Sequence, residues 1–109
     1  MIYILNTLVV PINFDKYPSV QVLLTRISVD EAKQLLRQGF VSAVGHEGTA
    51  QLLSKILGVN IPANRVSVWM EKGDVGVHFF LKTRLPEGAV LSEEQLSKLS
   101  FWIVKSQIL

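Results

Sequence analysis

Residues 65–82 read RVSVWMEKGDVGVHFFLK. Two runs rich in β-branched and aromatic residues, 65–71 and 75–82, flank the tripeptide Lys72-Gly73-Asp74. Such runs favour β-strands, and a short glycine-containing connection between them favours a tight turn. The pattern predicts a β-hairpin, which is an antiparallel pair of strands.

Three more strands and three helices are predicted around this hairpin. The strands cover residues 2–10, 20–27 and 101–108, and the turn formers of residues 11–19 indicate a loop. The first helix begins at Ser28, which forms a capping box with Glu31, and it ends at Gly39. The other two helices are expected at 46–57, ended by Gly58, and at about 92–99, where Ser92 and Gln95 fit a second capping box.

The element order β-β-α-α-β-β-α-β predicts an α/β fold, a mixed five-stranded sheet with about three helices packed on it. At 109 residues the chain is expected to form one domain over residues 1–109. The sheet face opposite the helices then needs a partner. Trp69 and Trp102, both expected on strands, are possible sources of exposed apolar surface, so we expect a homodimer.

The composition excludes several classes of protein. Hydrophobic residues make up 49% and charged residues 18% of the chain, which excludes disorder, and the net charge of +2 tolerates an anionic ligand without requiring one. The absence of cysteine excludes disulfides, thiol catalysis and thiolate metal sites. His46 and His78 lack the short spacing of a zinc pair, so no metal is expected. Neither a signal peptide nor an apolar run of about 18 residues is present, so we expect an intracellular protein without membrane association.

The hexapeptide Gly-His-Glu-Gly-Thr-Ala at residues 45–50 places His46 at the start of the predicted helix 46–57. The first backbone amides of a helix are unpaired and point outward, so they can hold a phosphate. His46 either decorates the helix entry or acts as an acid beside a bound phosphate. The catalytic alternative needs a nearby carboxylate, from Glu87 or Glu47, although Glu47 is better explained as a first-turn acid that complements the helix dipole.

A second polar cluster lies at residues 82–88. Arg84 is either a surface cation that pairs with Glu87 or a phosphate clamp that uses its planar guanidinium. An imidazole, a guanidinium and a carboxylate around one anion site suffice to cleave RNA without a metal. The hypothesis of a nuclease depends on whether His46, Arg84 and Glu87 meet in space.

Four other polar residues are candidates for the site. Asn6 and Thr7 have two interpretations, whereas Arg65 and His78 have a structural one. Asn6 and Thr7 interrupt the first strand, and they either line a ligand cleft or end the apolar run early. Arg65 is most simply a solvated cation after a turn. His78, between Val77 and Phe79 on a strand, is expected to face solvent or an interface rather than to act as an acid or base.

Three segments together resemble a family of crenarchaeal virus proteins. They are SAVGHEGTAQLL at 42–53, NRV at 64–66 and RLPEG at 84–88. The chain is similar in these segments to the anti-CRISPR ring nucleases, which destroy the cyclic tetra-adenylate messenger of type III CRISPR defence. The likeness covers nearly the whole chain, and its specific part is Gly-His-x-x-Thr followed by Arg-Leu-x-Glu-Gly.

The resemblance implies a homodimer that binds one cyclic tetra-adenylate on its two-fold axis and cleaves it by metal-independent attack of a ribose 2′-hydroxyl, without a cofactor. It implies His46 as the general acid, Glu87 as the carboxylate that orients it, and Arg84 as the cation that neutralises the scissile phosphate. The residues expected to contact the ligand are Asn6, Thr7, Gly45, Gly48, Thr49 and Arg65. Where the family often carries serine two positions after the histidine, this chain has Gly48.

The same resemblance implies a viral protein of the archaeal host cytoplasm that suppresses type III CRISPR signalling and forms no stable DNA complex. Two alternatives belong to other classes. A non-catalytic dimeric protein that binds nucleic acid or nucleotide would tolerate His46→Ala but not charge reversal across one face. A protein-interaction factor would instead depend on an apolar surface around Trp69 or Trp102.

Overall fold

The sheet is mixed and five-stranded, with the strand order β2-β5-β4-β1-β3. A computed structural model of residues 1–109 describes residues 1–82 and 98–109. Within these residues the strands are β1 (Ile2–Leu5), β2 (Val22–Ile27), β3 (Val41–Ser42), β4 (Val75–Leu81) and β5 (Phe101–Ile108), and the helices are α1 (Val29–Leu36) and α2 (Glu47–Leu57). The predicted α/β class and the five-stranded mixed sheet are confirmed.

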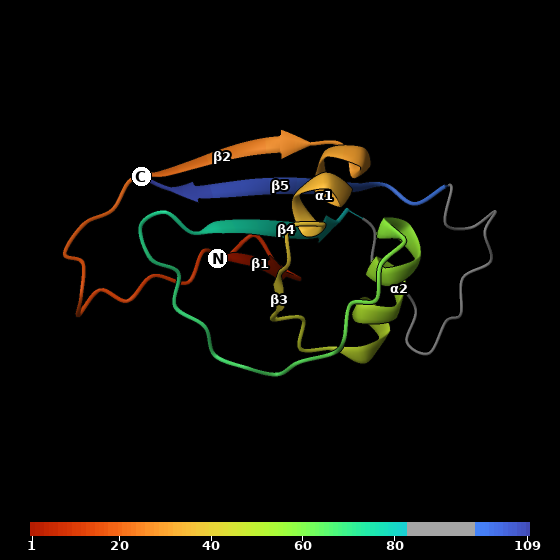
Figure 1. The fold of residues 1–109 in the computed structure, drawn as a ribbon, viewed down its shortest axis with the longest axis horizontal. Coiled ribbons are helices and arrows are strands. Elements are labelled where there is room, and N and C mark those ends of the chain that lie inside the picture. The colour runs from red at the N-terminus through yellow and green to blue at the C-terminus, as the bar shows by residue number, and fades with distance from the viewer. Residues whose placement is uncertain (83–97) are drawn as a thin grey trace.

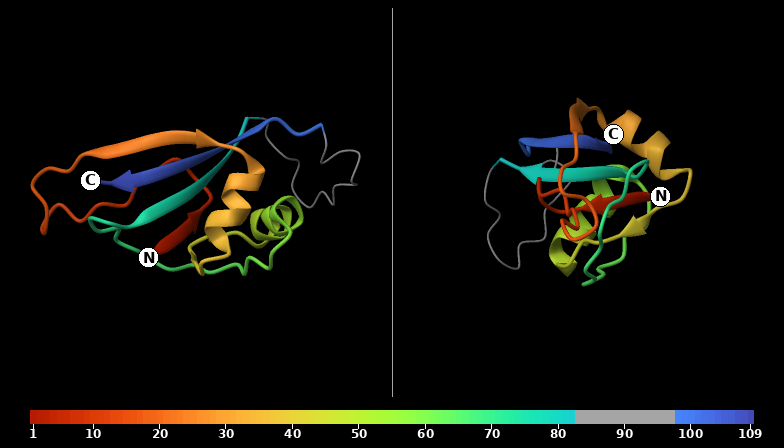
Figure 2. Two further views of the ribbon diagram at one scale, coloured as in Figure 1. Left: turned by 45° about the horizontal axis from the view of Figure 1, so that its top comes forward. Right: turned by 90° about the vertical axis from the view of Figure 1, so that its left-hand side faces the viewer.

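Four of the five strands, β1 to β4, run in the same direction, and β5 runs in the opposite one. β1 lies between β3 and β4 and pairs with both in parallel, whereas β5 pairs antiparallel with β4 and β2. The carboxyl ends of parallel strands lie at the same edge of a sheet. In Figures 1 and 2 both helices lie toward the end of the sheet at which β1 and β4 finish. The connections that leave β1 and β3 are therefore brought to the same end of the molecule as α2.

The two helices begin and end where local sequence signals indicate. Ser28 Oγ accepts a hydrogen bond from the Glu31 amide at 3.1 Å, and Glu31 Oε1 accepts one from the Ser28 amide at 3.3 Å, so the predicted capping box is present. α2 ends at Gly58, whose φ of 66° is the left-handed conformation that glycine adopts without a steric penalty. Both helix predictions are confirmed to within a few residues.

The main core lies between the helices and one face of the sheet. Ala32 and Leu36 of α1 and Leu53 of α2 pack against apolar side chains of the central strands, such as Val77 and Ile103. A smaller apolar cluster, Leu5, Ile12, Met70 and Ile108, lies against the other face. Because successive strand residues alternate between faces, Val77 contributes to the main core while its neighbour His78 faces the smaller cluster.

The predicted hairpin is wrong. Residues 65–71 form no strand, because the two hydrogen-bonding edges of β4 are already occupied by β1 and β5. The connection from α2 instead runs along one side of the molecule to the start of β4 (Figure 1). Its alternating pattern produces one-sided packing, with Met70 buried and Val68 partly buried in the smaller cluster. The fifth strand is the short β3, which the sequence pattern does not predict.

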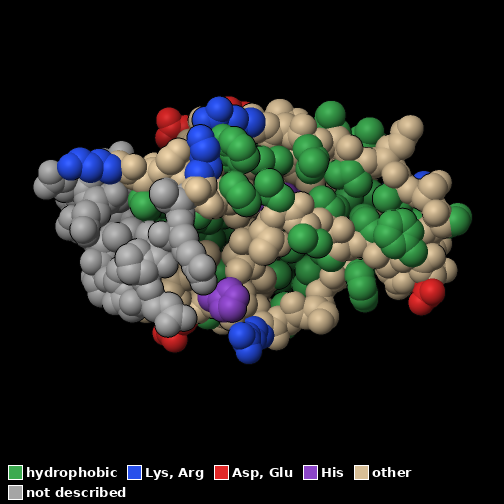
Figure 3. All heavy atoms as spheres, turned by 180° about the vertical axis from the view of Figure 1, so that it is seen from behind, with side chains coloured by type: hydrophobic (Ala, Val, Ile, Leu, Met, Phe, Trp, Pro, Cys, Tyr) green, Lys and Arg blue, Asp and Glu red, His purple; other side chains and the backbone are tan. Residues whose placement is uncertain are grey.

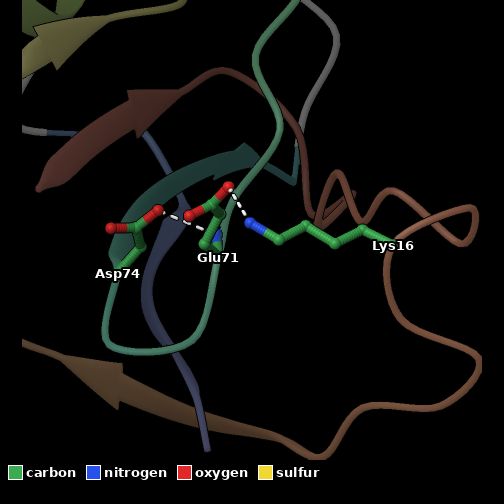
Figure 4. Close-up of polar contacts among 3 residues, drawn as sticks. All are labelled: Lys16, Glu71 and Asp74. Carbon is green, nitrogen blue, oxygen red and sulfur yellow. Dashed lines mark hydrogen bonds and ion pairs between the residues drawn. The ribbon is translucent and has the colours of Figure 1, made fainter.

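A turn does precede β4, although it joins no hairpin. The Asp74 amide donates to the Glu71 carbonyl at 2.9 Å, and Asp74 Oδ2 accepts from the Glu71 amide at 2.8 Å. Lys16 Nζ lies 2.6 Å from Glu71 Oε1, so the loop after β1 is linked to this turn (Figure 4). Gly73, at φ 92°, supplies the left-handed residue that the turn requires.

Two other boundaries differ from the predictions. β1 ends at Leu5 instead of residue 10, and β2 begins at Val22 instead of residue 20. The predicted third helix, 92–99, lies outside the described residues up to position 97, and Lys98 and Leu99 are not helical. Within the described residues, the helices are too short to cross a lipid bilayer.

Candidate functional site

The candidate site is formed by loops that leave the parallel strands β1 and β3. The Ala43 amide donates to the Ile4 carbonyl at 2.9 Å, which extends the pairing of these strands by one residue. Beyond this bond one connection passes through Asn6 and Thr7, and the other passes through Gly45 to α2. Parallel pairing of β1 with β3 thus brings two separate parts of the predicted ligand site to one edge of the sheet.

His46 is the N-cap residue of α2 and is exposed. Its carbonyl accepts the first helical hydrogen bond, from the Ala50 amide at 2.9 Å, while its side chain makes no capping bond. The amides of Glu47, Gly48 and Thr49 occupy the first turn, where a helix offers no internal acceptor. An exposed imidazole therefore lies beside a group of outward-facing backbone donors.

Arg65 packs directly over Gly45. Its Nε–H donates to the Gly45 carbonyl at 3.2 Å, and a Cβ atom added to Gly45 would lie 3.2 Å from Arg65 Cγ. Asn64 supports this arrangement, because its side-chain amide donates to the Ser42 carbonyl at 2.8 Å and its backbone amide donates to the Val44 carbonyl at 2.7 Å. The exposed guanidinium of Arg65 is thereby held one residue away from His46.

A cavity of about 300 Å³ lies beside Ala43, in the connection from β3 to α2. Asn6 and Thr7 line it together with Ser67 and Trp69, and the Trp69 side chain is 56% exposed. His46 and Arg65 do not line this cavity, but the segment 66–69 that forms one wall follows Arg65 directly. A second hollow, about 420 Å³ in volume, lies between α2 and residues 60–63. Glu47, the alternative candidate for the carboxylate, lines it, and the other predicted site residues do not.

Arg84 and Glu87 lie outside the described residues. Of the other predicted site residues, the structure groups Gly45, His46 and Arg65 at the start of α2. Gly48 and Thr49 belong to the first turn of the same helix, whereas Asn6 and Thr7 line the neighbouring cavity. Across residues 1–82 and 98–109, no three His, Asp or Glu side chains are grouped so as to hold a metal ion.

The expectation that His78 faces solvent or an interface is wrong, because its side chain is fully buried. Its Nδ1 lies 2.8 Å from the Thr7 carbonyl and its Nε2 lies 2.7 Å from Ser106 Oγ. Burial lowers the pKa of the His78 imidazole below its ordinary value, since desolvation disfavours the charged ring, and the Thr7 hydrogen bond partly opposes this effect.

The one sequence signal for a buried His78 is Gly76, two residues earlier on the same face of β4. A Cβ atom at Gly76 would overlap both the Ser106 hydroxyl and His78 Nε2, so the ring and the hydroxyl fill the space that the glycine leaves. A small residue at i−2 is too weak a signal to predict burial without the positions of β1 and β5.

Part of the sheet face opposite the helices stays exposed and carries apolar side chains. Seen from behind the sheet, hydrophobic side chains spread over much of this surface (Figure 3). Phe80 and Trp102 stack there with ring centroids 5.4 Å apart, and Leu24 is 54% exposed. Trp69, predicted on a strand, is exposed on the irregular segment 66–69 instead.

Comparison with known proteins places these features in a family of mostly viral relatives. Residues 2–103 match the STIV B116-like family. Protein 26 of Sulfolobus islandicus filamentous virus is 39% identical over 103 residues, which cover 93% of this chain and 86% of the relative. ORF117 of Acidianus two-tailed virus is 40% identical over 98 residues, which cover 87% of this chain and 81% of the relative.

The fold has also been observed in a solved structure. B116 of Sulfolobus turreted icosahedral virus superposes with a TM-score of 0.79 and 20% identity over 97% of each chain. This likeness supports the described arrangement of the sheet and helices, and the sequence match extends over nearly the entire chain. The protein therefore belongs to the STIV B116-like family.

Proposed function

We propose that this protein is an anti-CRISPR ring nuclease that binds cyclic tetra-adenylate at a homodimer interface and cleaves it without a metal. The observation that carries the proposal is the packing of Arg65 over Gly45, which holds a cation beside the exposed imidazole of His46 and the free amides of α2. An anion bound at this point meets positive charge, backbone donors and a proton donor together.

The proposed reaction is an internal transesterification. A ribose 2′-hydroxyl loses its proton to solvent and attacks the adjacent phosphorus, and the bond from phosphorus to the 5′-oxygen breaks. His46 donates a proton to the departing oxygen, and a 2′,3′-cyclic phosphate forms. Two such cuts convert the ring into two linear di-adenylates, and no water is consumed.

Each described group has a task in this scheme. The amides of Gly48 and Thr49 and the guanidinium of Arg65 stabilise the charge on the phosphorane, which is the largest electrostatic demand of the reaction. The proposal assigns the remaining tasks to Arg84, which neutralises the scissile phosphate, and Glu87, which orients His46.

The neighbouring cavity offers a site for one adenine of the ring. Trp69 presents an exposed aromatic face on which a base can stack, while Asn6 and Ser67 bring polar groups to the lining of the same cavity. The segment from Arg65 to Trp69 links this base site to the phosphate site, so phosphate and base contacts lie on one continuous stretch of chain.

The proposed homodimer uses the apolar face opposite the helices. Leu24 and Phe80 are exposed on this face and the half-buried Trp102 stacks on Phe80, so burial against a second copy would remove apolar surface from water. A two-fold axis presents the same groups twice, which matches a ring of four identical nucleotides.

The test is incubation of labelled cyclic tetra-adenylate with the protein in EDTA, followed by separation of the products. The wild type should yield linear di-adenylate with a cyclic phosphate, and His46→Asn should lower the rate about 10²- to 10⁴-fold. Asparagine is a favourable N-cap residue, so this variant removes the acid while preserving α2. Gln34→Ala, at an exposed position of α1, serves as the control.

The outcomes separate the nuclease from its alternative. An intact ring that binds tightly to the wild type would indicate a non-catalytic nucleotide-binding protein that sequesters the messenger. An intact ring without measurable binding would contradict both the nuclease and the nucleotide-binding protein. Equal cleavage by His46→Asn and the wild type would contradict the assignment of His46 as the acid.

A further inference from the structure

His78 connects the interior of the sheet to the loop that follows β1. The ring lies on β4 and is fully buried, and its two nitrogens contact Thr7 on one side and Ser106 of β5 on the other. These contacts join three segments that are distant in the sequence.

The Thr7 carbonyl determines which nitrogen carries the proton. A carbonyl oxygen can only accept, so Nδ1 must be protonated and must donate to it across the 2.8 Å contact. In the neutral ring Nε2 then has a lone pair, and the Ser106 hydroxyl donates to it across 2.7 Å. Ser106 thus satisfies the nitrogen that would otherwise be buried without a partner.

The loop that His78 holds has few other attachments. Among the described residues, the structure records one other hydrogen bond to the main chain of residues 6–10, from the Val9 amide to Thr7 Oγ1 at a long 3.4 Å. Asn6 and Thr7 nevertheless line the cavity beside Trp69. Because the loop has so few bonds of its own, the position of Asn6 and Thr7 depends on the hydrogen bond from His78 to the Thr7 carbonyl.

We propose that His78 is a positioning residue: its Nδ1–H holds the Thr7 carbonyl and so fixes the Asn6–Thr7 wall of the cavity, with Ser106 fixing the tautomer that makes this bond. The hydrogen-bond geometry stands independently of the ligand. Its consequence for affinity rests on the proposed function, because it requires the cavity to bind part of the cyclic nucleotide.

The tautomer is tested first, by the ¹⁵N chemical shifts of the imidazole nitrogens. The chain has two histidines, so His46→Ala leaves His78 as the source of a single set of signals. The expected spectrum shows a neutral ring with a proton on Nδ1 and none on Nε2. A neutral ring with its proton on Nε2 instead of Nδ1 would overturn the proposal, because the Thr7 carbonyl would then face an acceptor.

The positioning role is tested with the double variant His78→Leu/Ser106→Ala. It removes both polar partners together, which avoids leaving a buried hydroxyl or imidazole unpaired. Val77→Ala is the matched control, since Val77 is the neighbouring buried residue of β4 and faces the helix core instead of the loop. Both variants lose core interactions, but only the double variant loses the anchor of Thr7.

Two readouts separate positioning from general stability. The ¹⁵N order parameters of the Asn6–Val9 amides should fall from about 0.85 to below about 0.6 in the double variant and stay near the wild-type values in Val77→Ala. The dissociation constant for cyclic tetra-adenylate, measured in a His46→Asn background so that the ring stays intact, should rise about five- to tenfold in the double variant alone, as expected for one lost hydrogen bond.

Equal behaviour of the double variant and Val77→Ala would overturn the positioning role. If no form of the protein binds cyclic tetra-adenylate, the proposed function fails, while the tautomer and the order parameters still decide whether His78 anchors the loop.

Discussion

At the scale of single residues, the two imidazoles of the chain lie in opposite environments. His46 is exposed at the first turn of α2, where a helix leaves its amides unpaired. His78 is enclosed between three segments, and its hydrogen-bond partners, a carbonyl and a hydroxyl, carry no charge. The exposed ring is accessible to a ligand, whereas the buried ring is suited to holding structure.

From the burial of His78 we expect the free energy of unfolding to fall in mild acid. The pKa of His78 is lowered in the folded state from an ordinary value of 6.5, so below this pH the unfolded chain binds more protons than the folded one. The free energy of unfolding should therefore decrease as the pH falls below about 6.5 and level off below the folded-state pKa. Urea denaturation between pH 7 and pH 5 measures the effect.

The control is the variant His78→Leu/Ser106→Ala, whose stability should depend less on pH in this range because the titrating group is absent. An identical pH dependence in the wild type and this variant would assign the effect to carboxylates instead. A gain in wild-type stability on acidification would contradict the lowered pKa.

Trp69 provides a prediction about affinity. Its side chain is 56% exposed beside Asn6 and Thr7, so its removal should leave the core intact. Loss of one base-stacking contact is expected to weaken binding by about 1–3 kcal/mol, so Trp69→Ala should raise the dissociation constant for cyclic tetra-adenylate at least about fivefold. The dissociation constant of Trp69→Phe, which keeps an aromatic face, should lie between those of the wild type and Trp69→Ala. Equal affinities in titration calorimetry of all three proteins, each in the His46→Asn background that leaves the ring intact, would exclude a base at this cavity.

At the scale of elements, local chemistry accounts for the helices and for the ends of two strands. The capping box of α1 and the left-handed Gly58 after α2 depend on residues within one or two turns, so both are visible in the sequence. β5 has the predicted bounds, and β4 begins at the predicted residue. Segments whose signals lie within a few residues of each other were predicted best.

Gly48 in the first turn of α2 and Gly58 directly after the helix are expected to respond oppositely to alanine. Gly58 has a φ of 66°, and the left-handed conformation costs a residue with a Cβ about 1–2 kcal/mol, so Gly58→Ala should destabilise the protein by this amount. Gly48 lies in the first turn with open space around its Cβ position, so Gly48→Ala should stabilise by about 0.5–1 kcal/mol. Chemical denaturation compares the two, and a change of the same sign in both would contradict the assigned backbone conformations.

At the scale of the whole molecule, the two faces of the sheet differ in how completely they are covered. The helices cover one face, while residues of the smaller cluster cover only part of the other. Leu23 and Leu24 are neighbours on β2 with similar exposure, 49% and 54%, but they point to opposite faces. Their pairing partners on β5 are Gln107 and Ser106, and Ser106 belongs to the face that carries His78.

This pair tests the proposed homodimer with matched charge changes. Leu24→Glu introduces a charge on the open face and should yield a monomer by light scattering at concentrations where the wild type is a dimer. Leu23→Glu introduces the same charge on the helix side and should remain dimeric. A wild-type monomer, or equal effects of the two substitutions, would contradict an interface on the open face.

The predictions that are wrong concern contacts between distant segments. Residues 65–71 have strand-like composition, yet their expected partner, β4, is fully paired with β1 and β5. His78 was expected outside because alternation along β4 does not reveal that Thr7 and Ser106 enclose that face. β3 is only two residues long and has no pattern of its own; it exists because Val41 pairs with Tyr3.

The sequence by itself determined the α/β class, the starts and stops of both described helices, β5, and the position of His46 at a helix entry. The physical reason is that caps, left-handed glycines and apolar periodicity act through neighbours along the chain. Only the tertiary structure decided that β1 pairs in parallel with β4, that 65–71 is left without a partner strand, and that Arg65 packs over Gly45. These outcomes depend on which of several compatible segments pairs with a given strand edge. Burial across the whole molecule decides that competition, so neighbours along the chain do not reveal it.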